Sequence, residues 1–283
     1  MKVILEPTVT AFAKQVFIGH PDFKIPADGN DAVKIGAFAA KGCYDSFGEN
    51  GRANETNQRQ VIEQLHGSVL EHINASLYIQ GITRGLSLES NRHRQLAVSQ
   101  RSTRYTAEED AAIVLEPFYA DLFRKFTAEN SFHRVLNEVS GRYQWMFRFS
   151  DTLTSVTKEL ALIKNFLESA EASFAEYNDE VRTLELLNPN NLTGFNLRKW
   201  ARGKARNILP HALETRIAYT GNLRAWRWFI EARSNRHAEP EIRRLADKVL
   251  TALRLDYEMY FEDFESVGDY DGIPEWVPEF RKV

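Results

Sequence analysis

Apolar and polar positions alternate along residues 73–80 and again along residues 213–219, and each run predicts a strand with one buried face. A short apolar run over residues 2–6, ended by Pro7, predicts a further strand. Helical spacing of apolar residues predicts several helices elsewhere in the chain. The expected helices cover residues 31–41 with a stop at Gly42, a segment capped by Thr56 or Asn57, a segment starting at Thr220–Asn222, and a segment running from Pro240 with apolar residues as far as Phe264. Two or three further helices are expected within residues 107–205, where helical spacing is clear from Leu153 to Tyr177, and the turn-rich segment 187–191 is expected to join them. Strands interspersed with longer helices predict an α+β fold.

The composition fits a protein with a sizeable core. The chain has 283 residues, 43% of them hydrophobic, and we treat residues 1–283 as a single domain. Cys43 is the only cysteine, which excludes an internal disulfide and a multi-cysteine zinc site and favours a reducing compartment. Its thiol lacks a clear histidine and acid partner, so we expect a small buried residue rather than a nucleophile. Without an apolar stretch of about eighteen residues, we expect a soluble, cytoplasmic protein with no membrane partner.

Residues 92–104 hold four arginines, one histidine and no acid. In an extended segment Arg92 and Arg94 would lie on the face opposite His93. Arginine forks suit bidentate contact with phosphate, and the serines and glutamine among them could orient the anion, so we expect a site for a phosphorylated ligand. The alternative is a solvated basic stretch. The formal net charge of −3 argues against general polyanion binding, and neither a Rossmann phosphate turn nor a P-loop motif is present.

Four motifs, in order along the chain, resemble those of the flavin-dependent thymidylate synthases. Arg92-His93-Arg94, seven residues and then Ser102 resembles the family signature, and Thr103-Arg104-Tyr105 completes it. The other three motifs are His66-x-Ser68-x-x-Glu71-His72, Ala205-Arg206-x-x-Leu209-Pro210 and Asn222-Leu223-Arg224.

The resemblance implies reductive methylation of dUMP to dTMP, with 5,10-methylenetetrahydrofolate as carbon donor, NADPH as reductant and FAD as bound cofactor. It also implies a central antiparallel sheet with flanking helices, in a homotetramer whose active sites lie at subunit interfaces. No metal and no nucleic acid are implied.

Individual roles follow from the same resemblance. Arg233 is the expected catalytic residue, because its charge would stabilise negative charge developing on the uracil ring. The residues expected to bind the flavin are His66, Ser68, Arg92, His93, Arg94, Gln100, Asn222, Leu223, Arg224 and Trp228. The residues expected to bind dUMP are Glu89, Arg92, Gln100, Ser102, Thr103, Arg104, Arg206 and Arg233.

The chain departs from the family pattern in places. Gln100 stands where some members have glutamate, and Trp228 stands where members carry histidine or asparagine, so Trp228 either stacks on the flavin or packs in the core. The stretch between the signature and the C-terminal motifs is long for the family, which predicts a helical insertion within about 120–200.

Two other functions fit parts of the sequence. One is a nucleic-acid-binding protein that uses residues 92–104 and the helices over residues 224–244 as phosphate contacts. The other is a family member that binds flavin or nucleotide without catalysis. Trp228 is the only hint of such a loss, and the presence of Arg206 and Arg233 argues against it.

Overall fold

The computed structural model describes residues 1–108, 111–128 and 155–281. The chain divides into two compact units, which are described separately. Unit 1 consists of Met1–Glu6, Gly81–Gly85 and Arg101–Thr215, and unit 2 consists of Pro7–Gln80, Leu86–Gln100 and Arg216–Val283. Both units contain helices and strands, so the expected α+β class is confirmed at this level.

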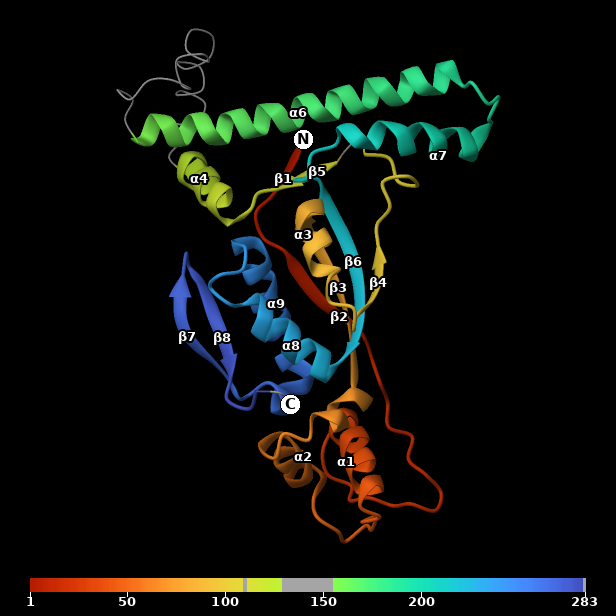
Figure 1. The fold of residues 1–283 in the computed structure, drawn as a ribbon, viewed down its shortest axis with the longest axis vertical. Helices are drawn as coiled ribbons and strands as arrows, with labels where there is room; N and C mark the ends of the chain where they lie inside the picture. The colour runs from red at the N-terminus through yellow and green to blue at the C-terminus, as the bar shows by residue number, and fades with distance from the viewer. Residues whose placement is uncertain (109–110, 129–154, 282–283) are drawn as a thin grey trace. The chain divides into compact units, whose positions relative to one another are not determined.

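Unit 1 is mostly helical in the part that the structure describes. Its helices are α4 (Pro117–Ala128), α6 (Ser155–Leu187), α7 (Gly194–Ala205) and the short 3-10 helix η3 (Arg206–Ile208). Two short parallel strands, β1 (Lys2–Ile4) and β5 (Ala112–Val114), complete it. Helices α6 and α7 lie side by side (Figure 1). The helical spacing expected up to Tyr177 falls on α6, while Leu153 lies outside the described residues. The turn expected over residues 187–191 is confirmed, since α6 ends at Leu187 and α7 begins at Gly194.

The core of unit 1 forms where α4 and α6 pack together with β5. Its apolar side chains are almost completely buried, and they come from segments distant in the sequence. They are Ile113, Leu115, Ala120, Leu122, Phe126, Leu160, Ile163, Ala170, Phe174 and Leu213. Asn188 turns the chain between α6 and α7, because its side chain exchanges hydrogen bonds with the backbone N–H and carbonyl of Leu192 at 2.8 and 2.9 Å.

Unit 2 is built around the largest sheet that the described residues form, with strand order β2-β3-β6-β4. Its strands are β2 (Thr8–Lys14), β3 (Asn74–Thr83), β6 (Glu214–Asn222) and β4 (Ala97–Gln100); the last residues of β3 and the first of β6 count in unit 1. The β2–β3 and β4–β6 pairs are antiparallel. The alternation expected over residues 73–80 is confirmed, since Ala75, Leu77 and Ile79 are buried whereas Tyr78 is exposed.

Two helices lie between β2 and β3 in sequence, and their ends differ from the predictions. Helix α1 (Asp31–Cys43) starts at Asn30, whose side chain accepts a hydrogen bond from the Val33 N–H at 3.1 Å. It continues through Gly42, because a single glycine weakens a helix by only about 1 kcal/mol. The predicted burial of Cys43 is wrong: the helix ends there, so no further turn covers the exposed thiol.

Helix α2 (Asn54–Glu63) begins before the predicted caps at Thr56 and Asn57. Its first N–H groups, those of Asn54 and Glu55, donate instead to the two carboxylate oxygens of Asp28, each at 3.0 Å. The carboxylate comes from an earlier loop, so no local pattern signals this start. The short 3-10 helix η1 (Gly67–His72) and helix α3 (Arg84–Ser90) follow α2 in the chain.

The C-terminal part of unit 2 contains the helices α8 (Leu223–Arg233) and α9 (Pro240–Tyr257) and the short 3-10 helix η4 (Glu258–Tyr260). Strands β7 (Phe264–Tyr270) and β8 (Ile273–Pro278) form an antiparallel ribbon that packs against α8 and α9 (Figure 1). The predicted start at Pro240 is confirmed. The predicted helical run to Phe264 is wrong, because the helix stops at Tyr257.

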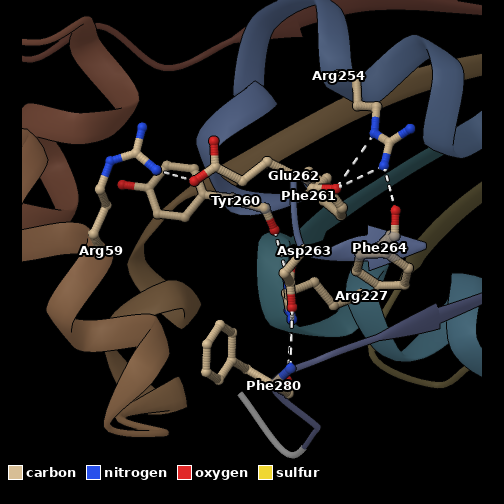
Figure 2. A network of polar contacts seen from close by, with 9 residues as sticks. All are labelled: Arg59, Arg227, Arg254, Tyr260, Phe261, Glu262, Asp263, Phe264 and Phe280. Carbon is tan, nitrogen blue, oxygen red and sulfur yellow. Dashed lines mark hydrogen bonds and ion pairs between the residues drawn. The ribbon is translucent and has the colours of Figure 1, made fainter.

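Arginine side chains bind the carbonyl groups where the chain leaves α9. Arg254 donates to the carbonyls of Phe261 and Phe264, with shortest distances of 3.1 and 2.7 Å, and Arg227 donates to that of Tyr260 at 2.5 Å (Figure 2). These contacts satisfy backbone groups that a continued helix would have paired. Among the described residues, no helix is both long enough and apolar enough to cross a membrane.

Candidate functional site in unit 2

The Arg-His-Arg motif lies in a turn between α3 and β4, not in an extended strand. Only residues 97–100 are extended, and residues 103–105 form a second turn, so the expected alternation along the whole motif is wrong. The expected difference between His93 and the two arginines beside it is confirmed, because Arg92 and Arg94 are exposed whereas His93 is buried. The guanidinium groups of Arg92 and Arg94 have no hydrogen-bond or ion-pair partner in the part of the chain that the structure describes.

Arg233, at the end of α8, lies between two residues of this region. Its Nε donates to Nε2 of His93 at 2.7 Å, and its Nη1 donates to Oε1 of Glu89 at 2.7 Å. The third nitrogen, Nη2, has no partner among the described residues, and about a fifth of the side chain is exposed. The structure therefore brings the expected catalytic arginine together with one expected flavin residue and one expected dUMP residue.

Two aromatic rings of α8 enclose the imidazole of His93. The ring centroids of Trp228 and Phe229 lie 4.6 and 4.7 Å from that of His93. Burial, reinforced by the charge of Arg233, lowers the pKa of His93 from 6.5 to about 4. The imidazole is therefore neutral at physiological pH. Phe229 had no role in the sequence analysis, although its place in the apolar pattern of α8 marks it as a core residue.

Hydrogen bonds to β6 and within the unit fix the α3–β4 corner. The hydroxyl of Tyr219 on β6 lies 2.7 Å from that of Ser90 and donates to Oδ1 of Asn91 at 2.9 Å. Burial raises the pKa of Tyr219 to about 12, so this phenol stays protonated. Gln100 Nε2 donates to the hydroxyl of Ser87 at 2.8 Å. Of these residues, only Gln100 was an expected site residue.

Two hollows of unit 2 contain most of the remaining expected flavin residues. The first hollow, of about 450 Å³, is lined by Asn222, Arg224 and Trp228 among others, and half of the Trp228 side chain is exposed. The second hollow, of about 850 Å³, is lined by His66, Ser68 and Cys43 among others. Arg224 belongs to both linings, and its Nη1 donates to Glu71 at 2.6 Å.

Two members of the Asn-x-Arg motif also have structural contacts. Asn222 is the N-cap of α8, since its Oδ1 accepts from the Ala225 N–H at 2.8 Å. The side chain of Leu223 is fully buried, and its N–H donates to the carbonyl of Ile73 at 2.8 Å. Neither contact tests the expected flavin role of these residues, which stays a prediction.

Two arginines of the competing nucleic-acid hypothesis are not available to a ligand. Arg227 is 3% exposed and forms a bidentate ion pair with Asp263 at 2.6 and 2.7 Å (Figure 2). Arg243 is 2% exposed and donates to the carbonyls of Tyr270 and Ile273 at 2.7 and 3.0 Å. Both guanidinium groups hold the β7–β8 end of the unit, so this hypothesis loses contacts that it requires.

Four of the expected dUMP residues, Ser102, Thr103, Arg104 and Arg206, belong to unit 1. Ser102 starts a turn in which its Oγ accepts from the Arg104 N–H at 3.3 Å, while Thr103 is buried and Arg104 is exposed. Arg206 is exposed at the start of η3. Arg202 of α7, which no sequence motif marked, donates to the carbonyl of Tyr105 at 3.1 Å and so supports this turn.

A buried carboxylate anchors the chain beside the same turn. Glu108 is completely buried and pairs with Arg101 Nη1 at 2.9 Å. Burial raises the pKa of Glu108, against the lowering effect of Arg101. The sequence offered no signal for this pair beyond the charges themselves.

Comparisons with known proteins show which family this chain belongs to. A family model described as thymidylate synthase complementing protein matches residues 27–255. The flavin-dependent thymidylate synthase of Mycolicibacterium gilvum is 34% identical over 267 residues, which cover 93% of this chain and 92% of the relative. This chain belongs to the flavin-dependent thymidylate synthase family.

Other relatives agree with this assignment. The flavin-dependent thymidylate synthase of Mycobacteroides abscessus is 33% identical over 96% of this chain and 95% of the relative. The crystal structure of thymidylate synthase X from Helicobacter pylori with FAD and dUMP is 21% identical, with a TM-score of 0.51 over 91% of this chain and 98% of that one. The structural likeness shows a shared fold. The family membership predicted from the four motifs is therefore confirmed.

Proposed function

We propose that this protein catalyses the reductive methylation of dUMP to dTMP, with bound FAD, 5,10-methylenetetrahydrofolate as carbon donor and NADPH as reductant. Family membership supports the reaction, and the Helicobacter pylori relative was crystallised with FAD and dUMP. The observation that carries the proposal is how the guanidinium group of Arg233 is held and exposed. Two of its guanidinium nitrogens are held by Glu89 and His93, and Nη2 is left for a ligand.

The residues of unit 2 fit a flavin dinucleotide. Arg92 and Arg94 are exposed and unpaired among the described residues, so their forks are open to a pyrophosphate. The exposed indole of Trp228 offers a face for stacking an aromatic ring. The proposed set is completed by His66, Ser68, His93, Gln100, Asn222, Leu223 and Arg224. When bound, FAD supplies the hydride chemistry that protein side chains lack.

Arg233 supplies the electrostatic part of catalysis. C5 of the uracil ring attacks as a nucleophile, which requires enolate-like negative charge on the pyrimidine, and a fixed guanidinium in a partly buried position stabilises that charge more than water does. Ser102, Thr103, Arg104 and Arg206 are proposed to bind dUMP. Glu89, Arg92 and Gln100 are further proposed dUMP residues.

The proposal extends to the assembly. We propose a homotetramer with a central antiparallel sheet and active sites at subunit interfaces, and a helical insertion within about 120–200. The antiparallel β2–β3 and β4–β6 pairs support the sheet, and the helices α6 and α7 support the insertion. Light scattering at catalytic concentration measures the oligomeric state.

An absorption spectrum of the purified protein tests the cofactor first. Bands between about 350 and 500 nm, bleached by NADPH under anaerobic conditions, are expected for a bound flavin. Conversion of dUMP to dTMP with the folate then tests the reaction. A protein that stays colourless after incubation with FAD contradicts the proposal.

Two variants test the role of Arg233. Arg233→Ala is expected to keep FAD and to lose turnover, whereas loss of both would make Arg233 a flavin residue. Arg59→Ala is the matched control, because Arg59 is an exposed arginine of unit 2 that pairs with Glu262 (Figure 2), whereas Arg233 binds Glu89 and His93. Its turnover is expected to equal that of the unchanged protein.

A further inference from the structure

We infer that His93 is a positioning residue for Arg233, and that its neutral imidazole orients the guanidinium group by accepting a hydrogen bond from Nε. The inference rests on the proposed function for the role of Arg233 in catalysis. It assigns His93 a contact with a neighbouring side chain, in addition to its expected place near the flavin.

The geometry at Arg233 determines the orientation of its guanidinium plane. A single hydrogen bond would leave the flexible arginine side chain free to rotate. Contacts at Nε and Nη1, both at 2.7 Å and to different elements of the corner, fix two points of a planar group. The remaining nitrogen, Nη2, then points in one direction only. An electrostatic catalyst requires such preorganisation, because its charge must already lie where charge develops.

The contact also determines the tautomer of His93. Nε–H of arginine can only donate, so Nε2 of His93 must carry a lone pair, and the proton of the neutral ring lies on Nδ1. Nδ1 is buried and has no hydrogen-bond partner among the described residues. A buried donor left unpaired is unfavourable and calls for an explanation. The hydrogen bond at Nε2 explains why Nδ1–H is left unpaired. In the other tautomer, the proton on Nε2 would face the Nε–H of Arg233, and neither group could accept a hydrogen bond.

The surroundings keep the imidazole in this state. Trp228 and Phe229 pack on the ring, which is 2% exposed, so rotation of the side chain would disrupt both contacts. Among the charged groups, Arg233 lies against His93 and disfavours its protonation, while Glu89 binds the far side of the guanidinium. A doubly protonated ring could not accept the hydrogen bond and would repel Arg233.

Two substitutions separate the acceptor from the rest of the side chain. H93Q places an amide oxygen near the position of Nε2, and H93M removes the acceptor but keeps an apolar side chain. H93M is expected to lower kcat by roughly 10- to 100-fold, because a small displacement of a catalytic group has effects of that size. The KM for dUMP and the amount of bound FAD should change little, and H93Q should recover most of the lost kcat.

A matched control is His237→Gln, the same replacement at an exposed histidine of unit 2, which should leave kcat unchanged. Two results overturn the inference. If H93M loses FAD in proportion to its activity, His93 acts through the flavin. If H93Q is as impaired as H93M, the acceptor atom is irrelevant.

The tautomer gives a test that needs no folded variant and no turnover. In the unchanged protein labelled with 15N-histidine, the shifts of the ring nitrogens distinguish the two neutral tautomers and the imidazolium. A neutral Nδ1–H tautomer that persists between about pH 5 and 8 is expected for one of the seven histidines. If every histidine titrates in that interval, or if the neutral one carries its proton on Nε2, the inference fails.

This measurement also separates the two proposals. A protein that forms no dTMP but shows the Nδ1–H tautomer contradicts the proposed reaction and leaves the His93–Arg233 contact standing. An active enzyme with the wrong tautomer contradicts only the inference about His93.

Discussion

Removing the guanidinium of Arg227 should destabilise unit 2 more than removing any exposed charge. The group is 3% exposed, and it forms two hydrogen bonds to Asp263, at 2.6 and 2.7 Å, and two to the carbonyls of Tyr260 and Phe280, at 2.5 and 3.1 Å (Figure 2). In Arg227→Met, Asp263 would stay buried with a single weak donor, the Phe280 N–H at 3.3 Å. An uncompensated buried charge of this kind costs about 3–5 kcal/mol.

The expected loss of stability in Arg227→Met corresponds to a measurable decrease in Tm. For domains of about 150–250 residues, 1 kcal/mol changes Tm by about 2–4 °C, so Tm should fall by roughly 6–20 °C. Urea unfolding followed by circular dichroism gives the free energy of unfolding directly. Lys14→Met is the control, because Lys14 forms an exposed ion pair with Asp256 in the same unit, and water already screens that pair. Its unfolding midpoint should hardly move.

A double variant tests the reason for the loss. In Arg227→Met with Asp263→Leu no buried charge remains, so the double variant should be more stable than Arg227→Met alone. If Arg227→Met unfolds at the same urea concentration as the Lys14→Met control, the ion pair contributes nothing and the reasoning is wrong. If the double variant is the less stable of the two, lost packing rather than stranded charge explains the effect.

Three further changes have defined outcomes. Asn222→Ala should lower the free energy of unfolding by about 1 kcal/mol through loss of the α8 N-cap, while Asn222→Ser should keep most of it, as measured by urea unfolding. Ile163→Ala should cost about 2–5 kcal/mol by opening a cavity in the fully buried core of unit 1, and equal stability would place this residue outside a packed core. The pKa of His93 is about 4 in the folded protein and 6.5 in the unfolded chain, so the unfolded chain binds the proton first as pH falls. The free energy of unfolding should therefore decrease between pH 6.5 and 4, by at most about 3 kcal/mol. Urea unfolding at each pH measures this decrease, which should be smaller in H93Q.

Helix starts that depend on neighbouring residues were predictable, and those that depend on distant residues were not. Pro240 opens α9 as its sequence position predicts, and Asn222 caps α8 from the adjacent residue. Helix α2 escaped the prediction because its cap is the carboxylate of Asp28, which lies in an earlier loop. The end of α9 escaped it because the aromatic run continues at helical spacing after the backbone has turned.

The site shows the same division. The residue types and spacing of the Arg-His-Arg motif indicated a phosphate-binding function, and the family comparison confirmed the family that these motifs resemble. The sequence did not predict which arginine side chains are buried. Arg224 and Arg227 lie three residues apart on α8, yet one is half exposed and the other is fully paired inside the unit. Their partners, Glu71 and Asp263, are distant in sequence in opposite directions.

The sequence alone determined the periodic elements, the local caps and the identity of the chemical groups, because each depends on neighbours within a turn or two of chain. The tertiary structure decided which arginines are structural and which remain open to a ligand. It also decided that His93 accepts a hydrogen bond from Arg233, since the two residues are brought together by packing of α8 on the α3–β4 corner. Contacts between distant residues depend on burial and on the paths of the intervening segments, and local sequence patterns record neither.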